Sequence, residues 1–181
     1  MIYGWDISTS IVGLSCFTND GEYQQSFHLD LRDEDGLMSK GDTFKEFLNQ
    51  FSYEKEAENY HFVEERLGGF SGGRTSAQVL MKLGAFNGIA SYIIWTHDLG
   101  THRQLTHLHP SSWKAIMKRE GLIIPPGADK KELTLAYVKR KQSKFEVQLN
   151  KKGNPQPWMY DRADSYCIGR PGFIKCIVSA N

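Results

Sequence analysis

Residues 1–29 read MIYGWDISTS IVGLSCFTND GEYQQSFHL, and this stretch decides the fold. Apolar and β-branched residues predict strands over Ile2–Ser8 and Ile11–Thr18, joined by a tight turn. The turn signal Asn19-Asp20-Gly21 follows, and Glu22–Leu29 alternates polar and apolar residues as a third strand does. The sequence therefore predicts that the chain opens with an antiparallel meander of three strands.

Asp6 lies inside the first strand, which is otherwise apolar. A buried carboxylate without a compensating charge is costly, and coordination of a cation removes that cost. The alternative is an exposed strand-end aspartate that caps the following turn. Asp6 is therefore a candidate metal ligand, with the turn-capping role left open.

The rest of the chain predicts alternating helices and strands. Asp42 is the expected N-cap of a helix over Thr43–Phe51, after an acidic loop. Arg170-Pro171-Gly172 predicts a break in the last helix, which begins near Trp158. Between them we expect a strand over Tyr60–Glu65, a helix over Thr75–Thr96, a strand over Leu105–Leu108, helices over 110–119 and 128–141, and an irregular segment over 145–157. This order predicts an α/β fold in one domain spanning residues 1–181, with a mixed five-stranded sheet flanked by helices on both sides.

Two further acidic groups accompany Asp6. Glu64 and Glu65 close an apolar strand, and Asp161 and Asp164 lie three residues apart, on one face of the last helix. Like charges on one face repel each other unless a cation lies between them, although acidic residues near a helix N-terminus also simply favour the helix dipole. Carboxylate oxygens suit Mg²⁺ or Mn²⁺, and two such ions promote phosphoryl displacement. The order of the three groups along the chain is more specific than any one of them.

These motifs resemble the RuvC family of Holliday junction resolvases. Ile2-Tyr-Gly-Trp-Asp6 is similar to the family's G-I-D opening, and Val63-Glu64 is similar to its I-E strand end, which favours Glu64 over Glu65. The later matches are Lys82-Leu-Gly-Ala-Phe-Asn-Gly88 to the K-L-G-x-x-x-G helix segment, Asp161-Arg-Ala-Asp164-Ser to the terminal D-x-x-D-A helix, and Pro110-Ser-Ser-Trp-Lys114 and Gly127-Ala-Asp-Lys-Lys131 to two stretches with lysines of the active-site region.

The resemblance implies an RNase H-like fold and a magnesium-dependent, structure-selective endodeoxyribonuclease. It implies a homodimer that resolves Holliday (four-way) junctions and other branched DNA. Two Mg²⁺ ions, for which Mn²⁺ substitutes, would perform the hydrolysis. The residues that it assigns to catalysis are the metal ligands Asp6, Glu64, Asp161 and Asp164, together with Lys114 and Lys131.

Three features depart from the family pattern. Ser8-Thr9-Ser10 replaces a Pro-Gly turn, the glycine-rich loop after Glu64 is longer, and residues 142–157 look inserted. These differences suggest a phage or viral branch.

The charge of the chain is unevenly distributed. Residues 1–109 carry 8 Lys/Arg and 15 Asp/Glu, whereas residues 110–181 carry 14 Lys/Arg and 6 Asp/Glu. A basic half indicates a polyanionic partner, with a merely solvated surface as the alternative. Phe70 would stack on an unpaired base at a junction centre or else pack in the core. The expected DNA contacts are Phe70, Arg74, Lys114, Lys118, Lys130, Lys131, Lys139 and Arg140.

The sequence does not indicate export or membrane insertion. The N-terminus lacks a signal peptide, and the longest uncharged stretch, Leu83–His97, falls short of a membrane span. Cys16, Cys167 and Cys176 form no CxxC pair, so we expect neither a disulfide framework nor a zinc site. We therefore expect a cytoplasmic protein.

Three other functions share parts of the pattern. An actin- or hexokinase-like ATPase also opens with a strand, an aspartate and a turn, but such chains are longer and have a second phosphate loop. An RNA/DNA hybrid ribonuclease has a similar acidic set, and here the long helix with Gly84 and Gly88 favours a dimeric resolvase instead. A catalytically inactive module that binds branched DNA is the remaining alternative, and the complete set of four carboxylates argues against it.

Overall fold

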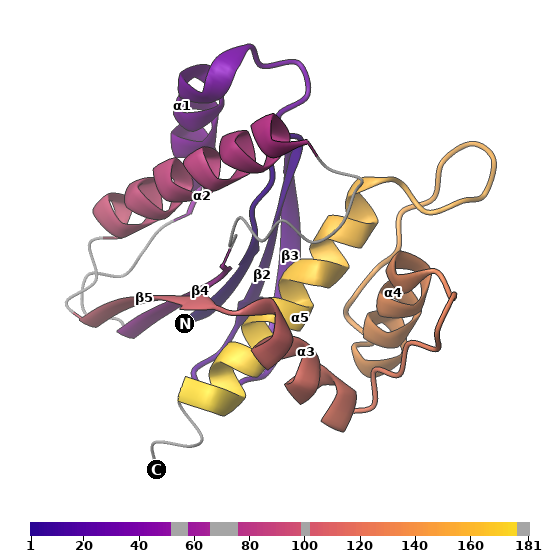
Figure 1. The fold of residues 1–181 in the computed structure, drawn as a ribbon. Coiled ribbons are helices and arrows are strands. Elements are labelled where there is room, and N and C mark those ends of the chain that lie inside the picture. The colour runs from indigo at the N-terminus through magenta and orange to yellow at the C-terminus, as the bar shows by residue number, and fades with distance from the viewer. Residues whose placement is uncertain (52–57, 66–75, 99–101, 177–181) are drawn as a thin grey trace.

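The computed structural model describes residues 1–51, 58–65, 76–98 and 102–176. Within these ranges a five-stranded sheet lies between two helical layers, with α1 and α2 on one face and α3, α4 and α5 on the other (Figure 1). The elements are β1 (Ile2–Asp6), β2 (Ile11–Phe17), β3 (Tyr23–Asp30), α1 (Gly36–Leu48), β4 (Glu58–Glu64), α2 (Ala77–His97), β5 (His102–Leu108), α3 (Pro110–Arg119), α4 (Lys130–Lys141) and α5 (Trp158–Cys176).

The sheet is mixed, with the strand order β3-β2-β1-β4-β5. The first three strands pair antiparallel, as the predicted meander requires, whereas β4 runs parallel to both β1 and β5. The buried residues form two clusters, one on each face of the sheet. The prediction of a mixed five-stranded sheet flanked by helices is confirmed.

The helix α1 differs from its prediction. It begins at Gly36 with Asp35 as N-cap, and Asp42 is exposed inside the helix instead of capping it. The glycine at position 41 looks like a loop residue in the sequence, but it is buried against α2, where a Cβ would lie 3.1 Å from Cγ2 of Ile89. The glycine lets the two helices pack closely, so tertiary packing overrides its poor helix propensity.

The predicted break in the last helix is also wrong. The helix α5 continues through Pro171 and crosses the middle of the sheet. A Cβ at Gly4 of β1 would lie 2.4 Å from the backbone nitrogen of Gly169, and one at Gly172 would lie 2.2 Å from the Phe62 ring. Packing of these glycines against the sheet offsets the hydrogen bond that the proline removes.

The helix α4 packs against α5 on this face of the sheet. As predicted, α4 is basic, and Oδ1 of Asp129 caps it by accepting a hydrogen bond of 2.8 Å from the Lys131 amide. Residues 145–157 hold only an isolated antiparallel bridge between Leu149 and Pro155, in agreement with the irregular segment predicted there.

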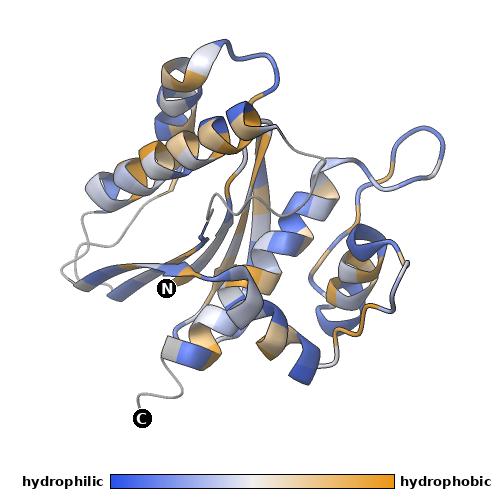
Figure 2. Cartoon of the chain, in the orientation of Figure 1, coloured by the Kyte–Doolittle hydropathy of each residue, from blue (hydrophilic) through white to orange (hydrophobic). Residues whose placement is uncertain are grey.

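The helix α2 is mostly pale or orange in Figure 2, where orange marks apolar residues. By length and composition alone it is apolar enough to cross a membrane. Its buried side chains, which include Phe86, Ala90 and Ile94, join the core beneath α1. Other α2 side chains remain exposed, Met81 to 75% and Tyr92 to 69%.

Candidate active site

Asp6 and Glu64 end two neighbouring parallel strands. The β1–β4 register pairs Trp5 with Val63, so the next position on each strand carries one of the two carboxylates. Side chains alternate along a strand, and Gly4 and Phe62, two positions earlier, both face α5. Asp6 and Glu64 therefore lie on the α5 face at the same end of the sheet.

The helix α5 brings the second pair of carboxylates to this end. Gly13 pairs with Asp6 across the β1–β2 ladder, and a Cβ at Gly13 would lie 2.1 Å from the carbonyl oxygen of Asp161. A hydrogen bond of 2.8 Å between the hydroxyl groups of Ser15 and Ser165 fixes the same helix on β2. The first turns of α5, which carry Asp161 and Asp164, therefore lie beside Asp6.

The four carboxylates match the donor preference of Mg²⁺ or Mn²⁺, which take hard oxygen ligands. Asp6 is 6% exposed, so this carboxylate lies in the protein interior and not at a solvated turn. Among the described residues, however, no three His, Cys, Asp or Glu side chains converge as a ready-made metal site. The four carboxylates fit the metal, and β1, β4 and α5 bring them to one end of the sheet. Their side chains would have to rotate to chelate an ion.

Trp113 contacts the Glu64 carboxylate. Its indole Nε1 donates a hydrogen bond of 3.1 Å to Oε2 of Glu64, and the ring itself is buried in the core beside α5. The bond fixes Glu64, rather than Glu65, towards the α5 layer. Trp113 lies within the Pro110–Lys114 stretch, yet no local pattern marks it as a site residue, because the bond depends on how α3 docks on β4.

Lysines lie beside this tryptophan. Nζ of Lys114 is 5.3 Å and Nζ of Lys130 is 5.5 Å from the centroid of the Trp113 ring. Two predicted site lysines thus meet from different helices at the residue that holds Glu64.

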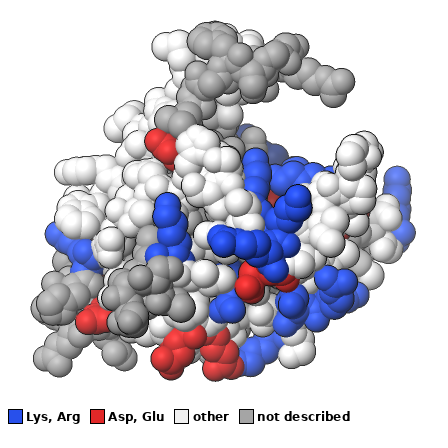
Figure 3. Space-filling view, turned by 60° about the horizontal axis from the view of Figure 1, so that its bottom comes forward, with Lys and Arg blue, Asp and Glu red and all other residues white. Residues whose placement is uncertain are grey.

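Further charged groups surround the α5 carboxylates. Burial raises the pKa of the Cys167 thiol well above its usual value, the Asp164 carboxylate raises it further, and the Lys130 ammonium group lowers it, so both charges lie near this thiol. Hydrogen bonding to Asp30 raises the pKa of Arg32, and Asp161 contributes to that rise. No sequence motif marks Arg32 as a site residue. Figure 3 shows Lys and Arg side chains gathered around a small acidic group on one face of the molecule.

The structure separates the other predicted DNA contacts. Lys131 lies over the Tyr160 ring, with Nζ 5.8 Å from its centroid, and Lys118 lies one turn after Lys114 on α3. Lys139 and Arg140 are exposed at the opposite end of α4, about 14 Å along the helix from Lys130 at 1.5 Å per residue. Phe70 and Arg74 lie outside the described residues.

Comparisons with known proteins agree with this architecture. No family model and no curated protein matches the sequence. A structure of Thermus thermophilus RuvC superposes with a TM-score of 0.57 at 15% identity, covering 94% of this chain and 92% of that one. This chain has the RuvC fold. A second structure, T. thermophilus RuvC in complex with a Holliday junction substrate, matches with a TM-score of 0.55 at 12% identity over 93% of this chain and 89% of that one. The predicted RNase H-like, RuvC-type fold is confirmed.

Proposed function

We propose that this protein is a magnesium-dependent endonuclease that cuts four-way DNA junctions and related branched DNA. The observation that carries the proposal is the position of Asp6, Glu64, Asp161 and Asp164, which three separate elements bring to one end of a RuvC-type sheet. The solved complex of T. thermophilus RuvC with a Holliday junction supports the choice of substrate by fold analogy.

Asp6, Glu64, Asp161 and Asp164 would hold two Mg²⁺ ions, for which Mn²⁺ substitutes. When bound, such ions would activate a water molecule for attack and would offset charge on the leaving oxygen. Trp113 keeps Glu64 turned towards the α5 carboxylates through its indole hydrogen bond. Lys114, Lys130 and Lys131 offset the repulsion between the acidic cluster and a phosphodiester, and they would contact phosphates near the cut without reading bases.

The protein would act as a homodimer, because two symmetric nicks across a junction require two active sites related by a two-fold axis. The exposed apolar stripe of α2 supports this assembly. It includes Met81 and Tyr92, and a Cβ at Gly84 or Gly88 would meet no atom within 4 Å, so a second helix has room to approach. Two sites at a fixed angle select branched DNA by its shape.

The proposal is tested by incubating the protein with a four-way junction, a flap, a duplex and an RNA/DNA hybrid of matched sequence, with Mg²⁺, Mn²⁺ or EDTA. Paired symmetric nicks in the junction, which require metal, would support it. Cleavage confined to the RNA strand of the hybrid would instead identify a hybrid ribonuclease, and metal-independent binding without cleavage would identify an inactive binding module. The cytoplasmic location and the phage or viral origin stay predictions.

A further inference from the structure

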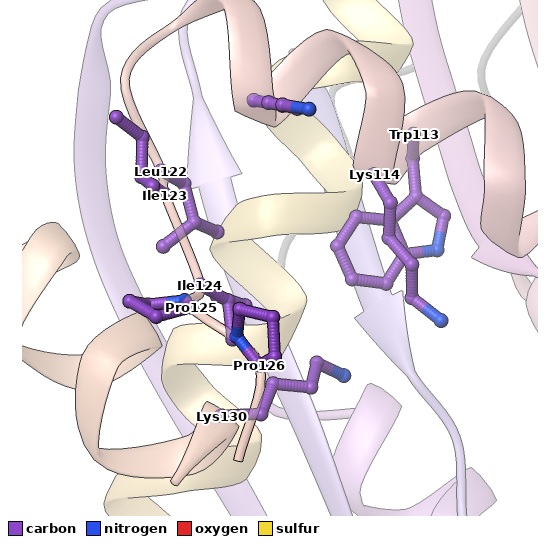
Figure 4. Close-up of a pocket in the computed structure, with 9 residues that line it drawn as sticks. Trp113, Lys114, Leu122, Ile123, Ile124, Pro125, Pro126 and Lys130 are labelled. Carbon is purple, nitrogen blue, oxygen red and sulfur yellow. The ribbon is translucent and has the colours of Figure 1, made fainter. Parts of the chain in front are cut away.

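A pocket of about 530 Å³ opens between α3 and α4, next to the candidate active site. Figure 4 shows Trp113 and Lys114 on one side and the connection between the two helices on the other, with Lys130 of α4 between them. The pocket falls in the size range of small-ligand sites in proteins. Its lining residues are Trp113, Lys114, Lys118, Leu122, Ile123, Ile124, Pro125, Pro126 and Lys130.

The walls of this pocket combine two kinds of chemistry. Leu122 to Pro126 form a continuous apolar wall, and two of its side chains are exposed, Ile123 to 68% and Ile124 to 38%. Among the described residues that line the pocket, the ionised side chains are the three lysines, and none is a carboxylate. A ligand that is both apolar and anionic complements such a surface.

The pocket shares Trp113 with the carboxylate cluster. The six-membered ring of the indole is turned towards the Leu122–Pro126 wall and its nitrogen points away from it (Figure 4), to the Glu64 carboxylate. The Lys114 and Lys130 ammonium groups, which lie over the same ring, serve both sites. A DNA strand whose phosphate lies at the carboxylates therefore places a neighbouring nucleotide at the pocket.

We propose that this pocket binds one unpaired nucleotide of the DNA strand, with its base against Ile123, Ile124 and the proline pair and its phosphate on the lysines. The proposal rests on the proposed function, in which DNA lies across the carboxylate cluster. Apolar contact with the face of a base tolerates any sequence. The described side chains that line the pocket offer no hydrogen-bond acceptor to a base edge, so they do not select a base by its amino group. Its role is to hold a base that has left the stack at the branch point. Distortion at the branch point lowers the free-energy cost of unstacking that base.

The test compares two single strands of equal length and charge, oligothymidylate and the matching abasic phosphodiester. Binding is measured by fluorescence anisotropy in EDTA. The protein should bind oligothymidylate at least about 5-fold more tightly, the lower end of the range that stacking of one base on an aromatic ring gives, because the base contacts here are aliphatic. Ile123→Ser combined with Ile124→Ser should reduce the affinity for oligothymidylate to that for the abasic strand and leave abasic binding unchanged, because every lysine remains.

Two controls keep the result interpretable. Leu149→Ser changes a side chain that is 57% exposed outside the pocket, and it should keep the full base preference. Ile123→Ser alone, at the more exposed position, should lose part of the preference with no change in melting temperature. An unchanged preference in the double variant, or no preference in the unaltered protein, would overturn the proposal. Loss of self-association in the double variant with an intact base preference would also overturn it and make the pocket a protein interface. Since binding is measured without metal, a protein that cuts no junction still gives an answer, and junction cleavage without base preference refutes the pocket alone.

Discussion

The indole Nε1 of Trp113 lies 3.1 Å from Oε2 of Glu64 and donates a hydrogen bond to it. Trp113 is 1% exposed and comes from α3, whereas Glu64 ends β4. A rigid, buried donor that holds a candidate metal ligand resembles the outer-shell partners that orient ligands in metal sites. Through this bond, the position of α3 determines how the Glu64 carboxylate is oriented in the acidic cluster.

Trp113→Phe should therefore weaken the response to metal without loss of DNA binding. The ring remains and only the donor disappears, so we expect cleavage to require about 10- to 100-fold more Mg²⁺, the usual effect of removing such a partner. The measurement is the Mg²⁺ dependence of junction cleavage, beside junction affinity in EDTA. Trp158→Phe is the matched control, because the buried Nε1 of Trp158 has no hydrogen-bond partner among the described residues. Equal Mg²⁺ dependence of cleavage in both variants would show that the Trp113 hydrogen bond does not position Glu64.

The four acidic residues can be singled out in the sequence because each carboxylate is marked locally, and their role as metal ligands stays a prediction. Asp6 and Glu64 end apolar strands, and the spacing of Asp161 and Asp164 sets them on one helix face, so the topology needed only to bring three ends together. The resemblance to a known family supplied that topology.

The errors come from packing that local patterns do not record. The helix α1 starts earlier than predicted because Gly41 serves a helix–helix contact. The predicted break in α5 is absent because glycines beside Pro171 pack on the sheet. The Trp113 bond and the pocket beside it were not foreseen, because both depend on how α3 and α4 dock.

Lys130→Ala combined with Lys131→Ala should weaken binding to junction and duplex alike. If these lysines neutralise phosphates, the slope of log K against log salt should become shallower by about 0.9 for each lost contact on duplex DNA. The measurement is affinity between low and moderate salt in EDTA. Lys45→Ala, exposed on α1 across the sheet, should keep the original slope. A double variant with an unaltered slope would place the DNA elsewhere.

The dimer prediction concerns the exposed stripe of α2. A charge at Met81 or Tyr92 would be buried unpaired in a two-fold interface, which is strongly unfavourable. Met81→Glu combined with Tyr92→Glu should therefore give a monomer that binds DNA but produces no paired nicks. Sedimentation at micromolar concentration checks this, with Leu149→Glu as a surface control. A protein that is already monomeric, with or without junction DNA, would refute the dimer.

His61 should make stability depend on pH. Its Nε2 lies 2.9 Å from Oδ2 of Asp98 and Nε1 of Trp5 donates to its Nδ1, all within the core. Burial lowers the pKa of His61 below its ordinary value of 6.5, although Asp98 raises it. The unfolded chain then binds more protons than the folded one just below pH 6.5. The contribution of His61 to the free energy of unfolding is therefore fully present above that pH and is lost as the pH drops.

Urea unfolding at a series of pH values between 7.5 and 5 measures this effect. His61→Gln should be less stable at neutral pH, and its stability should fall less steeply below pH 6.5. His109→Gln, which changes an exposed ring, should keep the original slope. The slope will not vanish, because burial also lowers the pKa of His28 and of His97. Parallel curves for His61→Gln and the unaltered protein would show that His61 does not titrate on unfolding.

Single-turnover cleavage of a four-way junction by Asp6→Asn, beside junction binding in EDTA, tests the central claim most directly. The substitution keeps the size of the side chain and removes the charge that would hold the metal. We predict that cleavage disappears while binding stays near that of the unaltered protein, since the lysines of α3 and α4 are untouched. Glu64→Gln should behave in the same way, and Glu65→Gln should cut normally. Near-normal cleavage by Asp6→Asn in Mg²⁺ would contradict the account, because the end of β1 would then not be the catalytic centre.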